Sequence, residues 1–442
     1  MTSHTMKNGG GVPVLTKPVL KEAAPLKERS NLGFRLMLVF SFLYYFRPED
    51  IIPGLAPLHL AKITGGLALL ALLLGSKKGR PKKLPLELKL IFALYFWLIL
   101  TIPFAFWRGG SFDVVFWEFS KAVIIGLVLT LCVSHTFQLR RLIFVQAFGV
   151  TLMTIASVIV NHRMQGRLAG IGDGLLSNPN DLAMNIALNW PLCLAFLLSG
   201  RGLARRIFWG AGMLIMVYAV MATYSRAGFM ALSLAIVLCL WEFGVRGKRF
   251  LMLAGAVLCG LVLLVAIPQN YSKRLETLAG KFQQGDLDNG SSEARKDLLI
   301  QSLKITATHP IFGVGPGNFQ AYTQLWRVTH NTYTELSSEC GIPALLIFLL
   351  LLSRAFRNVK EARRNLRTSG NKELQLYAGA LWVALWAYLL GAFFASTAYE
   401  LFPYYLVAYT TVLHRIASQA EDGKVVVVKK PAKVPVRVYS PA

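Results

Sequence analysis

The sequence has few charged residues, and it lacks any long polar stretch that could fold as a separate soluble domain. Charged residues make up 16% of the 442 positions, whereas a typical soluble domain carries roughly 25%. Hydrophobic residues account for 55%. A helix needs about 20 mostly apolar residues to cross a bilayer, and such segments recur along nearly the whole chain. The composition therefore predicts an integral membrane protein.

Cysteine is also scarce, and its spacing gives no sign of a metal site or a redox motif. The five cysteines fall within or at the ends of apolar segments: Cys132, Cys193, Cys239, Cys259 and Cys340. None has CxxC or metal-ligand spacing. We expect them to be small buried hydrophobic residues.

Acidic residues are outnumbered by basic ones, 22 against 47, which gives a formal net charge of +25. In a soluble chain this excess would suggest a nucleic-acid partner. Here the basic residues lie between the apolar segments, and Lys and Arg mark cytoplasmic loops because they resist translocation. We interpret the charge as a topology signal and expect no nucleic-acid partner. The basic tails also suit contact with anionic lipid of the bilayer.

The apolar stretches predict an all-α polytopic membrane protein of about twelve transmembrane helices. The predicted spans lie near 32–46, 57–75, 85–106, 117–136, 142–160, 181–199, 207–223, 227–243, 250–267, 336–353, 376–397 and 401–416. With a cytoplasmic N-terminus, every second loop is basic, as the positive-inside rule requires. These inner loops are 77–83, 138–141, 201–206, 245–249 and 354–367.

Three regions follow from this topology. Residues 1–31 are polar and basic and have no short apolar core with a cleavage site, so we expect a disordered cytoplasmic tail rather than a signal peptide. Residues 32–416 form the predicted transmembrane domain, and residues 417–442 form a basic cytoplasmic tail.

One long segment, 268–335 between predicted helices 9 and 10, is the only large feature expected on the outer side. The other outer turns are 47–56, 107–116, 161–180, 224–226 and 398–400. Within the long segment, residues 292–310 show a helical stripe after a Ser-Ser-Glu start signal, formed by Leu298, Leu299, Ser302, Leu303 and Ile305. We expect this helix to lie at the outer membrane surface.

Arg226 lies in "TYSRAG", between two predicted helices that are joined by almost nothing. We interpret this stretch as a tight outer turn in which Gly228 relieves the backbone. An Arg at the bilayer centre costs at least about 2.5–3.5 kcal/mol, so this one should lie at or just beneath the outer surface. It either snorkels to lipid headgroups or, with Tyr224 beside it, binds an anionic ligand. The rule that disfavours Arg on this side favours the second interpretation.

The stretch "GRLAGIGDGLLSNPNDLA" (166–183) ends in a turn and cap sequence that opens the next helix. Capping of the helix N-terminus explains Asn180 and Asp181 and is the better interpretation of them. Helix N-termini also bind anions, so contact with a ligand is compatible with capping. Arg163 and Arg167 are either loop charges without a role or further contacts to an anionic substrate.

The motif "HNTYTELSSECG" (330–341) precedes and opens predicted helix 10. His330 can accept a proton from a hydroxyl at neutral pH, because the pKa of histidine is near 6.5, although a lone His is more often structural. Further candidates for substrate binding are the polar residues of this motif and of the glycine-rich "GVGPGNF" (313–319): Asn318, Asn331, Tyr333, Glu335 and Glu339.

Two common kinds of site do not fit the outer loops. "GVGPGNF" lacks the terminal Gly-Lys-Ser/Thr of a phosphate-binding loop and follows no predicted strand, which argues against nucleotide binding. The outer loops hold no Cys/His pair at zinc spacing and no compact carboxylate cluster for a divalent ion. We therefore expect a mechanism without a metal or another cofactor.

Taken in this order, "NPND" (178–181), "YSRAG" (224–228), "GVGPGNF" and "HNTYTELSSECG" resemble the O-antigen ligase/polymerase superfamily. Each motif alone is weak, but their order and topology are fairly specific. The resemblance implies a metal-independent membrane glycosyltransferase of the GT-C type, acting on the periplasmic face of a bacterial inner membrane. It implies a glycan on undecaprenyl pyrophosphate as donor, and lipid A-core or a growing glycan as acceptor.

The resemblance also implies roles for three residues. Arginines at the position of Arg226 and on the long-loop helix, best matched by Arg295, would hold the pyrophosphate, and His330 would deprotonate the acceptor hydroxyl. The alternatives to Arg295 are Lys273, Arg274 and Lys296. The choice between ligase and polymerase, the sugar and any protein partner stay open.

A second hypothesis is a solute transporter or flippase, because about twelve helices with both ends inside is a common transporter topology. Secondary transporters usually show paired halves and broken helices near the membrane midplane. Here the polar motifs gather at the outer face and no second half repeats the first, which favours the glycosyltransferase.

Overall fold

The computed structural model describes residues 32–52, 54–75, 81, 83–172, 177–200, 202–247, 289–325 and 327–426, which all belong to one compact unit. Several predicted features lie outside the described residues: the N-terminal tail 1–31, the ninth span near 250–267 with Cys259, the long segment up to residue 288 with Lys273 and Arg274, and the end of the C-terminal tail from 427 onwards. The prediction of about twelve helices is therefore tested only in part.

The described residues are almost entirely helical. In chain order the elements are α1 (Leu32–Phe46), α2 (Pro48–Ile51), η1 (Ala56–Leu58), α3 (Leu60–Leu74), α4 (Leu86–Thr101), η2 (Ile102–Phe104), α5 (Arg108–Asp113), η3 (Val114–Phe119), α6 (Ser120–Cys132), α7 (Thr136–Val160), β1 (Arg163–Met164), β2 (Arg167–Leu168), α8 (Pro179–Ser199), α9 (Leu203–Ala222), α10 (Arg226–Cys239), η4 (Leu240–Val245), α13 (Asn289–Thr308), α14 (Phe319–Thr323), α15 (Thr332–Ser369), α16 (Lys372–Ala392) and α17 (Leu401–Val426). The prediction of an all-α polytopic membrane protein is confirmed at this level.

Within the described part of the chain, eight helical stretches are long and apolar enough to cross a bilayer: Leu86–Phe104, Arg108–Cys132, Thr136–Val160, Pro179–Ser199, Leu203–Ala222, Arg226–Val245, Thr332–Arg367 and Lys372–Ala392. Helices α1 and α3 are shorter apolar helices. Large apolar side chains stay exposed along these stretches, among them Phe96, Trp117, Ile159, Val237 and Leu346. Such side chains face lipid when the helices lie in a bilayer, because lipid tails are as apolar as they are.

Some local features differ from the sequence prediction. The predicted fourth span, 117–136, begins earlier and ends earlier, because α5, the π-helical η3 and α6 run on as the single stretch Arg108–Cys132. Helix α17 continues to Val426, past the predicted start of the tail at 417. A small antiparallel hairpin of β1 and β2, in which Arg163 pairs with Leu168, was not predicted.

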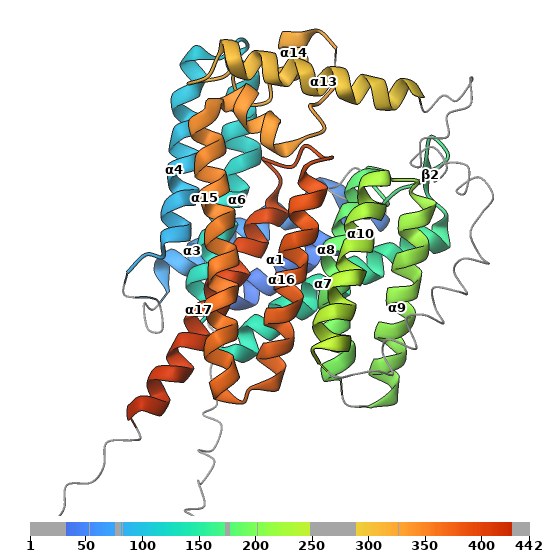
Figure 1. The fold of residues 1–442 in the computed structure, drawn as a ribbon, viewed down its shortest axis with the longest axis vertical. Coiled ribbons are helices and arrows are strands. Elements are labelled where there is room, and N and C mark those ends of the chain that lie inside the picture. Colours follow the sequence, from blue (N-terminus) through green and yellow to red (C-terminus); the bar gives the residue numbers. More distant parts are fainter. Residues whose placement is uncertain are drawn as a thin grey trace, which may run out of the picture. The chain divides into compact units, whose positions relative to one another are not determined.

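The loops gather at two ends of the helix bundle. Helix α4 runs antiparallel to α15, because Glu87 at its start forms an ion pair with Arg354, while Trp97 near its end donates a hydrogen bond to the Cys340 carbonyl (2.9 Å). Figure 1 shows the α9–α10 turn, α13, α14 and the start of α15 towards one end. We call this end, together with the α16–α17 connection (393–400), the motif end, and the end at which α9 and α16 begin the basic end.

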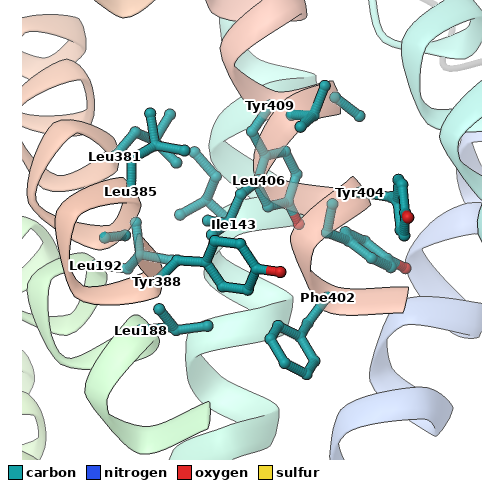
Figure 2. Close-up of a cluster of buried hydrophobic side chains, with 14 of the residues drawn as sticks. Ile143, Leu188, Leu192, Leu381, Leu385, Tyr388, Phe402, Tyr404, Leu406 and Tyr409 are labelled. Carbon is teal, nitrogen blue, oxygen red and sulfur yellow. The ribbon is translucent and has the colours of Figure 1, made fainter. Parts of the chain in front are cut away.

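The core between the two ends is built from apolar side chains of several helices. Figure 2 shows one such cluster, in which Ile143 of α7 and Leu188 of α8 lie near Leu385 and Tyr388 of α16 and Phe402 of α17. All are almost fully buried. Since lipid removes the hydrophobic driving force between helices, close packing of this kind is what holds α7, α8, α16 and α17 together.

Candidate functional site

Arg226 begins α10, directly after the short turn that ends α9 at Ala222. Ser225 caps the new helix, and its Oγ accepts a hydrogen bond from the backbone N–H of Gly228 (3.2 Å). Tyr224 adopts the left-handed conformation that makes the turn possible, with φ 50°. The predicted tight turn is confirmed, and Arg226 is half-buried at the motif end.

The role predicted for Gly228 is wrong. It lies inside α10 with helical backbone angles, and it is needed for close packing: a Cβ at this position would meet the Cβ of Ala183 in α8 at 2.3 Å. The left-handed strain of the turn falls on Tyr224 instead. The missing side chain therefore brings the N-terminal turns of α8 and α10 together.

Arg167 joins three of the predicted segments. Its Nε donates to the carbonyl oxygen of Thr223 in the α9–α10 turn (2.8 Å), and its Nη2 donates to Oδ1 of Asn180 at the start of α8 (2.7 Å). The hairpin, the "NPND" turn and the "YSRAG" turn thus meet at one guanidinium group. Arg163 behaves differently, because it is exposed and donates only within its own hairpin, to Asn161 Oδ1 and the Gly166 carbonyl (both 2.9 Å).

The cap of α8 is made by Asn178, whose Oδ1 accepts from the backbone N–H of Asn180 (2.8 Å). Capping by the side chains of Asn180 and Asp181 was predicted, and this is wrong: the Asn180 side chain accepts from Arg167, and α8 takes its cap one position before Pro179. The Asp181 side chain is half-buried and has no hydrogen bond to another described residue.

Helix α13 carries Arg295 and packs against α15, as Figure 1 shows. The predicted helical stripe is confirmed for Leu298, Ser302 and Ile305, which are buried, but Leu303 is 51% exposed. Leu298 and Ile305 form a small core with Val314 and Phe319 of the glycine-rich segment. Arg295 precedes Leu298 by three residues, so it lies on the same face of the helix as this core.

His330 lies between these elements and the start of α15. It is half-buried and in the left-handed conformation, with φ 52°. The residues on either side fix it: Thr329 bonds through Oγ1 to Ser396 Oγ (2.9 Å), and Asn331 caps α15 by accepting from the N–H groups of Tyr333 (3.0 Å) and Thr334 (3.1 Å). A left-handed non-glycine residue between two anchored neighbours is a strained position of the kind that concentrates at functional sites.

The imidazole of His330 is held neutral. Burial lowers the pKa of His330 to about 4, and the guanidinium groups of Arg295 and Arg327 add to this effect by charge repulsion. Arg295 and Arg327 therefore lie close enough to His330 to act on its charge. At neutral pH the ring is unprotonated and can accept a proton.

The carboxylates of Glu339 and Glu335 accept hydrogen bonds from the backbone around them. The carboxylate of Glu339 accepts from the N–H groups of Gly317 (2.8 Å) and Phe319 (3.1 Å) and from the hydroxyl of Tyr399 (2.7 Å). That of Glu335 accepts from the N–H of Ala398 (3.0 Å). Both side chains are buried. Together they attach the glycine-rich segment and the α16–α17 connection to the start of α15.

A break in α15 makes this attachment possible. Gly341 has φ 82°, and a Cβ there would lie 1.8 Å from the Ile311 carbonyl oxygen, so only glycine fits between the two backbones. The two segments are also joined by hydrogen bonds from Val314 N–H to the Ser338 carbonyl (3.0 Å) and from Gly315 N–H to the Glu339 carbonyl (2.8 Å). The glycine-rich motif and "HNTYTELSSECG" therefore fold as one unit.

Two other predicted residues also have internal partners. Tyr333 donates through its hydroxyl to the Leu389 carbonyl (3.0 Å), and the fully buried Asn318 donates to the carbonyls of Trp107 and Val314 (both 3.1 Å). Contact of these two with a substrate stays a prediction.

Sequence reasoning missed two charged residues at the motif end. Arg327 acts on the charge of His330 from three positions before it, and the excess of outer basic residues could have drawn attention to it. Glu400, at the end of the α16–α17 connection, lies within electrostatic reach of Asp181. No pattern in the sequence links these two carboxylates, because 219 positions separate them and only the packing of α8 against α16 brings their elements together.

Residues 211–349 match a family model described as "O-Antigen ligase". The matched range contains Arg226, Arg295, Arg327 and His330. The match covers less than half of the chain, and over this range it confirms the predicted resemblance to the O-antigen ligase/polymerase superfamily. It supports a membrane glycosyltransferase-like enzyme that uses lipid-linked glycan. None of the curated proteins matches the chain in sequence.

Proposed function

We propose that this protein transfers a glycan from undecaprenyl pyrophosphate to a sugar hydroxyl, as an O-antigen ligase or a surface-polysaccharide polymerase. Arg226 and Arg295 hold the pyrophosphate of the donor, and His330 takes the proton of the acceptor hydroxyl. The main support is that Arg295 and His330 come together at the motif end, inside the range that matches the O-antigen ligase model.

The charges suit the departure of pyrophosphate. Negative charge develops on the leaving phosphate oxygen, and preorganised cations stabilise it in the transition state by about 3–4 kcal/mol for one good donor. Guanidinium groups match phosphate oxygens with a planar fork of donors. Arg226 opens α10 and Arg295 lies on α13, so in this proposal the pyrophosphate is held from two separate elements.

His330 supplies the second half of the reaction. A general base contributes a factor of about 10²–10⁴, and it must be unprotonated to act. A pKa of about 4 keeps the ring neutral but makes it a weak base. Because Arg295 and Arg327 contribute to this low pKa, an anionic donor bound beside them raises the pKa of His330 by compensating their charge. The base therefore becomes stronger once the donor is in place.

The membrane arrangement follows from the same reaction. The donor lipid lies in the bilayer and the acceptor sugar in water, which a site at the membrane boundary can serve. We infer that the motif end faces the periplasm of a bacterial inner membrane and that both termini are cytoplasmic. The mechanism needs no metal, since the arginines supply the positive charge.

The test replaces Arg226 or His330 by Ala in cells that lack the native copy, with Lys304→Ala as a matched control because Lys304 is exposed on α13. We expect surface polysaccharide to fall below detection in the first two and to stay normal in the control. Wild-type levels in the Arg226 or His330 variant, at normal protein abundance, would sink the proposal. Single repeat units on the surface indicate a polymerase, and long glycans left on the carrier indicate a ligase.

A further inference from the structure

The motif end also carries a second group of charged side chains, which the proposed reaction does not yet use. We call Glu118, Lys121, Asp181 and Glu400 the charged cluster. They come from η3, α6, α8 and the α16–α17 connection. Burial raises the pKa of Glu400 to about 7, the carboxylates of Asp181 and Glu118 add to the rise, and Lys121 opposes it. The other three groups therefore lie within electrostatic reach of Glu400.

None of the cluster's carboxylates has a hydrogen bond to a residue that the structure describes. Glu118 is exposed, so we consider the other two, Asp181 and Glu400. Both are half-buried at the motif end. A carboxylate has about four acceptor positions, and partly exposed oxygens are open to a molecule that binds from outside. Both oxygens of each group are thus ready to accept hydrogen bonds from a bound molecule.

A third polar group, on α8, has an acceptor atom without a partner among the described residues. Asn185 lies one helical turn beyond Asp181 on α8 and donates through Nδ2 to the Asp181 carbonyl (3.0 Å). Its side chain is fully buried, and its Oδ1 has no hydrogen-bond partner among the described residues. An unsatisfied acceptor at this depth indicates that something other than the described protein groups completes the site.

The chemistry of the cluster favours a carbohydrate over a cation. A calcium ion takes six to eight oxygen ligands, whereas no group of three or more metal-binding side chains gathers within the described ranges. The ammonium group of Lys121 beside Glu400 also disfavours a second positive charge. Sugar hydroxyl groups are hydrogen-bond donors that carboxylates accept well, and they can also accept from Lys121.

The position of the cluster identifies which sugar it meets. Asp181 follows Asn180, which binds Arg167, and Arg167 binds the turn that leads into Arg226. The first sugar of the donor is bonded directly to the pyrophosphate that Arg226 is proposed to hold. That sugar must lie within one bond of the phosphate, and Asp181 stands next to the place where the phosphate is expected.

We propose that Asp181 and Glu400 form the binding site for hydroxyl groups of the first sugar of the lipid-linked donor, with Asn185 at its floor. This inference rests on the proposed function, and it names the residues by which the protein would select the donor sugar. Arg226 and Arg295 would bind any polyprenyl pyrophosphate, whereas Asp181 and Glu400 would distinguish a carrier with a sugar from a carrier without one.

The experiment measures the affinity of the purified full-length protein in nanodiscs for two probes. One is undecaprenyl pyrophosphate without sugar, and the other is the lipid-linked glycan extracted from cells that lack this protein. The variants are Asp181→Asn with Glu400→Gln, which keep shape and remove charge, and Glu361→Gln as a control at the basic end. Glu400→Gln alone, in a connection outside the helices, replaces the double variant if the latter is not monodisperse.

We expect the wild type to bind the glycan-bearing carrier at least about tenfold more tightly than the sugar-free carrier, because only the former makes charge-assisted hydrogen bonds with the two carboxylates. In the double variant this preference falls to about twofold or less, while affinity for the sugar-free carrier is unchanged. The control keeps the wild-type preference.

Three results overturn the inference alone: an unchanged preference in the variant, equal loss of affinity for both carriers, or a wild type that binds both carriers equally. If the unchanged preference is accompanied by a raised KM for the acceptor, the two carboxylates contact hydroxyl groups of the acceptor instead. A wild-type protein that binds neither carrier contradicts the proposed function itself.

Discussion

The two ends of the helix bundle use their carboxylates differently. At the basic end each of four glutamates forms an ion pair with an arginine: Glu87, Glu242, Glu361 and Glu373. At the motif end, Glu335 and Glu339 accept hydrogen bonds from backbone N–H groups, and Asp181 and Glu400 have no hydrogen bond to another residue in the described ranges. Three of these pairs join different helices, whereas Glu361 pairs with Arg357 of its own helix α15. The carboxylates of the basic end therefore mainly hold helices together.

This difference separates a structural end from a chemical one. Ion pairs such as Glu242–Arg363 and Glu87–Arg354 link helices far apart in sequence and leave little charge for a ligand. At the motif end, Arg47 with Asp50 is an ion pair of the structural kind. Of the other carboxylates there, Glu335 and Glu339 hold loops, and Asp181 and Glu400 are the two that we propose face a ligand. A site that binds an anionic lipid-linked sugar needs such a division, because charges already paired with each other offer less to a substrate.

Among the substitutions that test this difference between the two ends, we expect the largest effect on glycan transfer at Arg295. Arg295→Ala should lower the rate of glycan transfer by about 10²–10³, since one preorganised donor to the developing charge is lost. Transfer is measured with purified protein and lipid-linked donor. Lys304→Ala, on the same helix but exposed, should keep wild-type activity. Equal activity of the two variants would remove Arg295 from the site and point to Lys273, Arg274 or Lys296.

A smaller loss is expected at Glu339. Glu339→Gln keeps the shape of the side chain but leaves one oxygen to serve the N–H groups of Gly317 and Phe319 and the Tyr399 hydroxyl. Charge-assisted bonds are about twice as strong as neutral ones, so we expect about a tenfold loss of transfer together with a lower melting temperature. A lost activity at unchanged stability would instead mean that Glu339 touches the substrate.

The pH dependence should reveal the charges around His330. Transfer needs the neutral ring, so activity falls as the pH drops through the pKa, which is about 4 without donor. The acid limb of kcat/KM for the donor should therefore lie near pH 4, and that of kcat at higher pH, because bound pyrophosphate compensates the arginines. Arg327→Ala removes one repelling charge and should move the limb of kcat/KM upwards. An identical limb in wild type and variant would show that Arg327 does not act on His330.

The smallest effect on transfer is expected at the basic end. Glu242→Gln breaks the ion pairs with Arg246 and Arg363 and leaves these arginines without their carboxylate. The melting temperature should fall, while transfer per folded molecule should stay within about twofold of wild type. A transfer defect as large as that of Glu339→Gln would abolish the contrast between the two ends.

Much of this architecture could be predicted from the sequence, because apolar length and loop charge are local properties. The turn before Arg226, the helix that carries Arg295 and the position of His330 before α15 all follow from such patterns. The cap of α8 was assigned to the wrong residues, since three polar side chains stand within four positions and only the backbone shows that Asn178 makes the bond.

The parts that could not be predicted depend on contacts between distant segments. Gly341 breaks α15 because the Ile311 carbonyl lies against it, and Gly228 serves the packing of α10 on α8 rather than the turn. Glu400 resembles any glutamate in a short loop until the fold brings it near Asp181. Long-range packing of this kind leaves no period or motif in a single sequence.

The most direct test of the central claim, that the motif end binds the pyrophosphate of the lipid carrier, is the affinity of the purified protein for undecaprenyl pyrophosphate. Wild type, Arg226→Ala and Arg205→Ala are compared, since Arg205 is an exposed arginine at the start of α9 and so at the basic end. We predict at least about a tenfold weaker affinity for Arg226→Ala, as the loss of one charge-assisted contact implies, and no change for Arg205→Ala. Equal affinity in all three proteins, or a loss confined to Arg205→Ala, would contradict the claim.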